Sequence, residues 1–190
     1  MLQDLSRSGR TATMVTVWTI GHGTRRIGEF LDLLESAGIE HLVDVRTAPG
    51  SRRNPQFGQE ALSAALERSG IAYSWENALG GFRKARPDSP HTALRNAGFR
   101  GYADHMDSVE FRGALARVIE TSADARTAIM CAESVWWRCH RRMIADALVA
   151  EGHRVIHLLD GGEREHALHP NARVVDGCPL YDVGAQGTLV

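Results

Sequence analysis

The stretch from Arg126 to Ala150 constrains the fold of this chain more than any other part of the sequence. Residues 128–130 form a short apolar run typical of a buried strand, and apolar residues recur at helical spacing over 143–148. Between these two patterns lie two thiols, a carboxylate, an imidazole and three guanidiniums. They belong to Cys131, Glu133, Arg138, Cys139, His140, Arg141 and Arg142. Because ligands bind at the carboxyl edge of a parallel α/β sheet, the pattern predicts a site between a strand end and a helix start.

The rest of the chain repeats this alternation of strands and helices. Apolar runs predict five strands, over 15–20, 42–45, 71–75, 128–130 and 155–159, and helical spacing predicts helices between them. The alternation predicts an α/β fold, a Rossmann-like three-layer sandwich with a mostly parallel five-stranded sheet. We expect the strand order 3-2-1-4-5, in which strands one and four are neighbours.

The sequence also predicts how the chain is divided. Residues 1–13 are polar and are expected to be a loose or disordered tail, and 14–190 a single domain. A long irregular stretch at about 76–106 reads as an inserted loop and helical region, typical of a lid or binding loop. The segment beyond Glu163 is expected to be irregular.

Composition limits the classes of protein that this chain can belong to. A net charge of -1 argues against the overall positive charge of a general DNA-binding protein. Three cysteines do not make a disulfide framework, so a reducing cytoplasm is the expected location. The first residues lack the apolar core of a secretory signal, and no apolar run approaches the roughly 20 residues of a membrane span. A membrane is therefore not an expected partner.

The expected strand order gathers polar residues from several loops at one edge of the sheet. The turn Gly21–Thr24 ends the first strand abruptly and would bring His22 and Thr24 close to Cys131 and Glu133. Arg46 and Tyr73 would stand along the same edge. The prediction is one cleft at the point where the winding of the sheet reverses.

These motifs together resemble a bacterial family catalogued as domain of unknown function 488. The resemblance runs from about Thr16 to Asp160 and is most specific at the cysteine motifs. It rests on Gly21-His22-Gly23-Thr24, Asp44-Val45-Arg46, the loop from Pro49 to Phe57, Leu79-Gly80-Gly81, Cys131-Ala132-Glu133 and Cys139-His140-Arg141-Arg142. The turn has Gly23 where the family usually has serine. The resemblance implies a Rossmann-like α/β fold and no settled activity.

The two clustered cysteines have three readings. Cys139 is placed beside positive charge at a helix start, which favours a thiolate and suits a nucleophile. Both cysteines are also consistent with small buried core residues, and this reading is the stronger one for Cys131 because it lies at a strand end. Cys131, Cys139 and His140 are also the right kinds of ligand for zinc or iron, with a fourth ligand from His22 or Glu133. The spacing is not C-x-x-C, however, and adjacent Cys and His side chains diverge on a helix.

A phosphatase-like or rhodanese-like loop is disfavoured. Cys131 and Arg138 are one residue further apart than the C-x-x-x-x-x-R spacing of that class. The loop between them contains Trp136 and Trp137 and no glycine, so it does not readily form a nest of N–H groups.

Arginines form the clearest collective signal, because guanidinium groups match phosphates and carboxylates. The candidate substrate-binding residues are Thr24, Arg46, Arg52, Arg53, Tyr73, Arg138, His140 and Arg141. Several of the arginines could instead be solvated or pair with acids, and Asp44 is expected to orient Arg46. Glu133 and His22 are candidates for general acid–base catalysis. Trp75, Trp136, Trp137 and Tyr73 would stack on a base or fill the core.

The leading hypothesis is an enzyme that acts on an anionic, phosphate-bearing substrate, such as a nucleotide or nucleic-acid component. Its catalytic residues would be His22, Glu133, Cys139 and Cys131, and the reaction is a hydrolysis or a group transfer. Two alternatives remain: a thiol- or metal-binding regulatory protein, and a nucleic-acid-binding accessory module. The expected partner is a small anionic ligand or a nucleic acid, and a homodimer is left open.

Overall fold

The protein is built around a six-stranded, mostly parallel sheet. The structure, a computed structural model, describes residues 13–50 and 52–183, so the expected N-terminal tail lies outside the described residues except for Thr13. The strands of the main sheet are β1 (Thr16–Gly21), β2 (His41–Asp44), β3 (Ala72–Trp75), β4 (Thr127–Cys131), β5 (Arg154–Leu159) and β6 (Gly162–Glu165). The order across the sheet is β3-β2-β4-β1-β5-β6, and only β6 is antiparallel to its neighbour.

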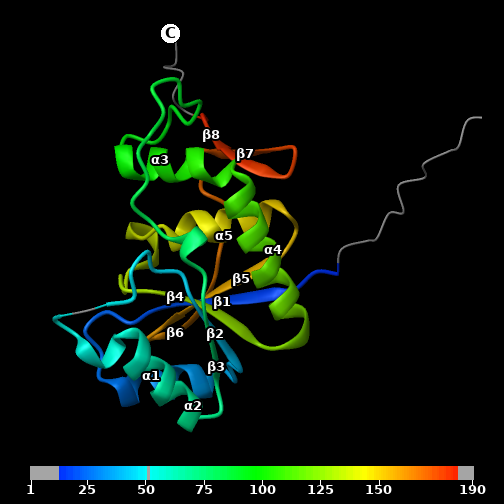
Figure 1. Ribbon diagram of the computed structural model, residues 1–190. Coiled ribbons are helices and arrows are strands. Elements are labelled where there is room, and N and C mark those ends of the chain that lie inside the picture. The colour runs from blue at the N-terminus through cyan, green and yellow to red at the C-terminus, as the bar shows by residue number, and fades with distance from the viewer. Residues whose placement is uncertain (1–12, 51, 184–190) are drawn as a thin grey trace, which may run out of the picture.

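Helices cover both faces of the sheet and complete three layers (Figure 1). They are α1 (Ile27–Ser36), α2 (Gln59–Arg68), α3 (Ala97–Met106), α4 (Val109–Asp124) and α5 (Arg141–Ala150). Phe30 and Leu34 of α1 pack with Leu62 and Leu66 of α2 on one face, below the sheet in Figure 1. The other three helices contribute the apolar cluster on the opposite face. None of the helices in the described part of the chain is both long enough and apolar enough to cross a bilayer.

The fold class expected from the sequence is confirmed, but the expected strand order is wrong. β4 lies between β2 and β1 and pairs with both, whereas the sequence placed β1 between β2 and β4. All five residues of β4 are buried, as suits a central strand. The long connection from β3 to β4 carries α3 and α4, so the chain can return to the middle of the sheet. The expected contact between β1 and β4 is present.

The C-terminal segment is also more regular than the sequence indicated. β6 adds a sixth strand to the sheet, and β7 (Ala172–Val175) and β8 (Cys178–Tyr181) form a separate two-stranded sheet. β6 is short and all of its residues are exposed, so it lacks the apolar run by which the other strands are recognised. Tyr181 of β8 is fully buried and helps to close the core beside α5.

Candidate active site

A large cleft lies at the carboxyl ends of the central strands. Its volume is about 1030 Å³, and it is lined by residues from the loops after β1, β2 and β4 together with residues around 81–82 and 96–102. Backbone hydrogen bonds hold these loops together: His22 N donates to the Cys131 carbonyl at 3.0 Å, and Val45 N donates to the Met130 carbonyl at 2.9 Å. The loops after β1 and β4 therefore share one cleft, which both His22 and Glu133 line.

Most of the candidate residues named from the sequence line this cleft. They are His22, Thr24, Arg46, Arg52, Arg53, Cys131, Glu133, Arg138, Cys139 and His140. Tyr73 and Arg141 are not among the lining residues. The hydroxyl of Tyr73 donates to Asp44 at 2.9 Å. Arg141 is 1% exposed and lies beneath the cleft, where its guanidinium donates to the Thr19 hydroxyl and to the Glu133 carbonyl. Both residues position the site without lining it.

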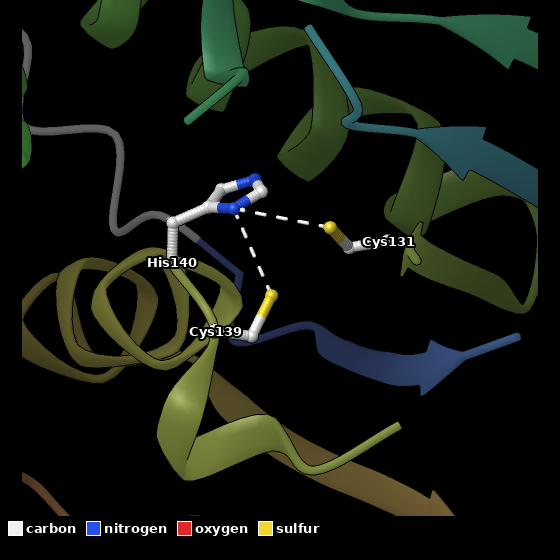
Figure 2. A group of neighbouring side chains, drawn as sticks. All are labelled: Cys131, Cys139 and His140. Atoms are coloured by element: carbon white, nitrogen blue, oxygen red, sulfur yellow. Dashed lines mark hydrogen bonds between the residues drawn. The ribbon is translucent and has the colours of Figure 1, made fainter. Parts of the chain in front are cut away.

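Two thiols and an imidazole that line the cleft point toward one another (Figure 2). The Nδ1 atom of His140 lies 3.9 Å from the sulfur of Cys131 and 3.7 Å from the sulfur of Cys139. The three atoms all lie within 4.8 Å of one another. The Nε2 atom of His140 is 3.1 Å from the carbonyl oxygen of Val45, which can only accept a hydrogen bond. The proton of the neutral ring therefore resides on Nε2, and the lone pair of Nδ1 is directed toward the sulfurs.

The sequence expectation that the Cys139 and His140 side chains diverge fails because Cys139 is not in a helix. Its backbone is extended, with φ -119° and ψ 150°, after the short 3₁₀ turn Trp136–Arg138. His140 is the residue that precedes α5. This change of backbone direction between the turn and α5 aims both side chains at the same point.

The two thiols lie close together, and their interaction moves their pKa values in opposite directions. The interaction with Cys131 lowers the pKa of Cys139, and the positive charge of Arg141 lowers it further, although burial opposes the shift. The same interaction raises the pKa of Cys131, and burial raises it further. Cys139 is therefore the thiol of this pair that ionises first.

Arg46 is committed to the framework of the cleft. Its guanidinium forms a buried ion pair with Asp44, with Nη2 at 2.5 Å from Oδ2, and donates to the Phe57 carbonyl at 2.9 Å. Asp44 thus orients Arg46, as the sequence suggested, and Arg46 anchors the loop that carries Arg52 and Arg53. His22 stacks on Phe57, with ring centroids 4.3 Å apart. Burial lowers the pKa of His22, so the ring is neutral at pH 7.

The charged groups that remain available in the cleft are peripheral. Arg52, Arg53 and Arg138 are exposed and line it, as does the carboxylate of Glu133. Glu133 Oε1 accepts a hydrogen bond from the backbone N of Val135 at 3.2 Å, which fixes the carboxylate near the thiols' strand. The cleft therefore combines a buried floor of sulfur and imidazole with a rim of guanidinium groups.

Gly81 and Phe82 line one wall of the cleft, and the sequence analysis identified Gly81 only as part of a motif that carries the family resemblance. The Tyr102 hydroxyl donates to the Leu79 carbonyl at 2.7 Å, and the Thr47 hydroxyl donates to the Gly81 carbonyl at 2.9 Å. A Cβ on Gly81 would lie 3.1 Å from Nδ1 of His140, so only glycine lets this wall approach the ring freely. Phe82 is 97% exposed at a φ of 63°, a backbone conformation that costs a non-glycine residue about 1–2 kcal/mol.

None of the four aromatic residues proposed for base stacking lines the cleft. Trp136 stacks on His157 with ring centroids 4.0 Å apart, and Nε1 of Trp75 donates to the Arg46 carbonyl at 2.8 Å. Phe82 and Phe99 line the cleft instead. The two glycines before Phe82 were the only sequence signal that this aromatic is held at a special backbone position.

A buried chain of hydrogen bonds beneath the floor also escaped the sequence analysis. It runs from the Thr19 hydroxyl to His157 (2.7 Å), from His157 to His166 (3.0 Å) and from His166 to the carboxylate of Asp146 (3.0 Å). Because the carboxylate only accepts, each ring donates toward Asp146 and accepts from the Thr19 side. Thr19 also accepts from Arg141, so the chain supports the guanidinium beneath the cleft. The sequence did contain one sign of this buried chain, which is the histidine His157 within the apolar run 155–159.

His157 makes the stability of the fold sensitive to acid. Its pKa is lowered from 6.5 to about 3, chiefly because burial desolvates the charged ring and secondarily because His166 lies beside it. Between about pH 6.5 and about pH 3, the unfolded chain therefore binds a proton on this histidine that the folded chain does not bind. The free energy of unfolding falls as the pH falls through this range. We expect His157→Gln to flatten the pH dependence of the unfolding free energy by about 1 kcal/mol per pH unit in this window.

Denaturant unfolding at several pH values between 4 and 7 measures this slope, which stays informative even if the variant is less stable at every pH. The matched control is His41→Gln on β2, whose half-buried ring bonds Ser74 at 2.9 Å and should contribute less. A slope that is the same in wild type and His157→Gln would contradict the expectation.

The fold and the cleft together define an α/β protein with a mostly parallel sheet and a thiol–imidazole cluster at the carboxyl edge of that sheet. The chain belongs to the family described as Domain of unknown function DUF488, whose model matches residues 26–148. The matched segment contains both cysteines of the cluster, and it confirms the resemblance seen in the motifs. Searches of curated proteins and of solved structures found no match.

Proposed function

We propose that this protein is an enzyme that acts on an anionic, phosphate-bearing substrate, such as a nucleotide or a nucleic-acid component, in the cleft after β1, β2 and β4. The observation that carries the proposal is the composition of that cleft. Three exposed guanidiniums line the same cleft as two buried thiols and a half-buried imidazole. Clusters of perturbed titratable groups in a large concave site are typical of catalytic centres.

The exposure of each side chain indicates the role that the residue would have in this reaction. Arg52, Arg53 and Arg138 have guanidiniums free to hold an anion, whereas Arg46 and Arg141 are buried and engaged. Glu133 has the exposed carboxylate suited to proton transfer, and neutral His22 is the second acceptor in the cleft. Cys139 and Cys131 with His140 form the reacting end, where the thiols act as nucleophile or as ligands. The reaction is a hydrolysis or a group transfer, and a reducing cytoplasm would keep both thiols free.

Phe82 supports a substrate that carries a base. Its ring is held almost fully in solvent at the cleft wall in a strained backbone conformation. Strain of this kind persists where the surrounding structure enforces it, as at binding sites. A flat base could stack on the ring while its phosphate reaches the arginines, a contact worth about 1–3 kcal/mol.

The test is direct binding of a fluorescent nucleoside triphosphate and of a short single-stranded oligonucleotide. We expect each of Arg52→Ser, Arg53→Ser and Arg138→Ser to weaken binding about 10-fold, because a charge-assisted hydrogen bond contributes about 1.5 kcal/mol or more. Arg68→Ser, at the exposed end of α2 and outside the cleft, is the matched control and should bind as wild type. Equal binding of the nucleotide and the oligonucleotide by all four variants would contradict the proposal.

A second candidate function is a thiol-based regulatory protein, which the closeness of Cys131 and Cys139 favours. Mild oxidation followed by mass spectrometry would detect a Cys131–Cys139 disulfide if this candidate is right. Binding confined to the oligonucleotide, weakening with salt and without turnover, would instead favour a nucleic-acid-binding accessory module.

A further inference from the structure

The geometry points to a zinc site made by Cys131, Cys139 and His140, with its fourth coordination position open to the cleft. The evidence is the arrangement of the three ligand atoms, which come from the end of β4 and from the residues just before α5 (Figure 2). The inference deepens the proposed function, because it supplies the same cleft with a Lewis acid.

The separations of the three atoms match a tetrahedral ion. With bonds of about 2.3 Å to sulfur and about 2.0 Å to nitrogen, a sulfur and a nitrogen ligand of tetrahedral zinc lie about 3.5 Å apart. The Nδ1 atom of His140 lies 3.7 Å from one sulfur and 3.9 Å from the other. An ion could therefore enter with shifts of a few tenths of an ångström. Two thiolates and an imidazole are the ligand types that select zinc over magnesium or calcium.

The imidazole is already oriented as a ligand. Its Nε2 donates to the carbonyl of Val45, which leaves the lone pair of Nδ1 facing the sulfurs. A backbone carbonyl that receives the second N–H of a histidine is a usual support for a metal-binding ring. Gly81 lies beside the same ring, so close that a Cβ on it would come within 3.1 Å of Nδ1. The ring is therefore placed between the residue that follows β2 and the wall of the cleft.

The surroundings fit an open rather than a closed site. All three residues line the cleft of about 1030 Å³. Within the described ranges 13–50 and 52–183, no fourth thiol, imidazole or carboxylate belongs to the group. Structural zinc sites close with four protein ligands, whereas catalytic sites hold three and leave one position for water or substrate. The fourth position here therefore faces the arginines of the rim.

Metal binding to the full chain, purified under reducing conditions, tests the inference. Zinc and cobalt(II) ions alone are titrated into the protein, and stoichiometry is measured by elemental analysis after dialysis. We expect one ion per chain, and a cobalt spectrum with thiolate charge-transfer and strong tetrahedral d–d bands. Cys131→Ser, Cys139→Ser and His140→Ala should each weaken binding by about 100-fold or more.

The third cysteine provides the matched control. Cys178 lies on β8, outside the cleft, so Cys178→Ser should bind zinc as wild type does. Failure of wild type to retain an ion, or a cobalt spectrum without thiolate bands, would overturn the inference even if a ligand variant does not fold. Loss of binding in Cys178→Ser, with binding retained in Cys131→Ser, would overturn it as well.

The open position is tested by adding inorganic phosphate to the cobalt form. A shift of the d–d bands is expected when an anion replaces the bound water, and an unchanged spectrum would show that the position is closed. The inference and the proposed function fail separately. A protein that binds no metal overturns only the zinc site, and nucleotide binding that ignores Arg52, Arg53 and Arg138 overturns only the function.

Discussion

Replacing Asp146 with alanine is expected to lower the free energy of unfolding by about 3–5 kcal/mol, because it leaves several buried hydrogen-bond donors without an acceptor. The carboxylate is fully buried in α5. Its Oδ1 accepts from His166 and from the backbone N of His169, and its Oδ2 accepts from the Tyr181 hydroxyl at 2.8 Å. No apolar replacement can satisfy these three donors, and water has little access to them.

Denaturant unfolding of Asp146→Ala and Asp146→Asn measures the effect. Asparagine keeps one acceptor oxygen, and the Tyr181 hydroxyl can turn to accept from its amide, so the expected loss is only about 1 kcal/mol. The control is Asp182→Ala, which removes an exposed ion pair with Arg173 and should leave stability nearly unchanged. Wild-type stability in Asp146→Ala would show that the buried chain does not support the fold.

Gly21→Ala is expected to destabilise the protein by about 3 kcal/mol and to distort the cleft. A Cβ at this position would overlap the carbonyl oxygen of Glu133 and lie 2.7 Å from Nη2 of Arg141. The first of these is a backbone atom of the loop after β4, which cannot turn away as a side chain can. Overpacking of this kind costs about 1–3 kcal/mol, and here it also pushes apart the two loops that bring His22 to the thiols.

Thermal unfolding and metal or nucleotide binding of Gly21→Ala are the measurements. Gly28→Ala is the matched control, because a Cβ at Gly28 meets nothing within 4 Å and alanine is favoured inside α1. We expect Gly28→Ala to be as stable as wild type or slightly more stable. Equal stability and equal binding in the two variants would contradict the close approach of β1 and the loop after β4.

The sequence determined most of the helices and strands and much of the lining of the cleft. The apolar runs and helical spacings predicted β1 to β5 and their helices. Each of these elements buries one face, and the spacing of the apolar residues on that face is visible in the local sequence. The clustering of polar residues after those strands predicted that His22, Cys131 and Glu133 line one cleft, because parallel strands end at the same edge.

The tertiary structure alone decided how these parts are used. Strand order depends on pairing between segments far apart in the chain, so the sequence of β4 did not indicate that it lies between β2 and β1. The exposed strand β6 had no apolar pattern to reveal it. Which arginines are free was equally hidden, since Arg46 and Arg52 differ only in what lies beside them once the chain has folded. The chemical type of each side chain can be read from the sequence, whereas its burial, its partners and the direction in which it points are set by the packing of the folded chain.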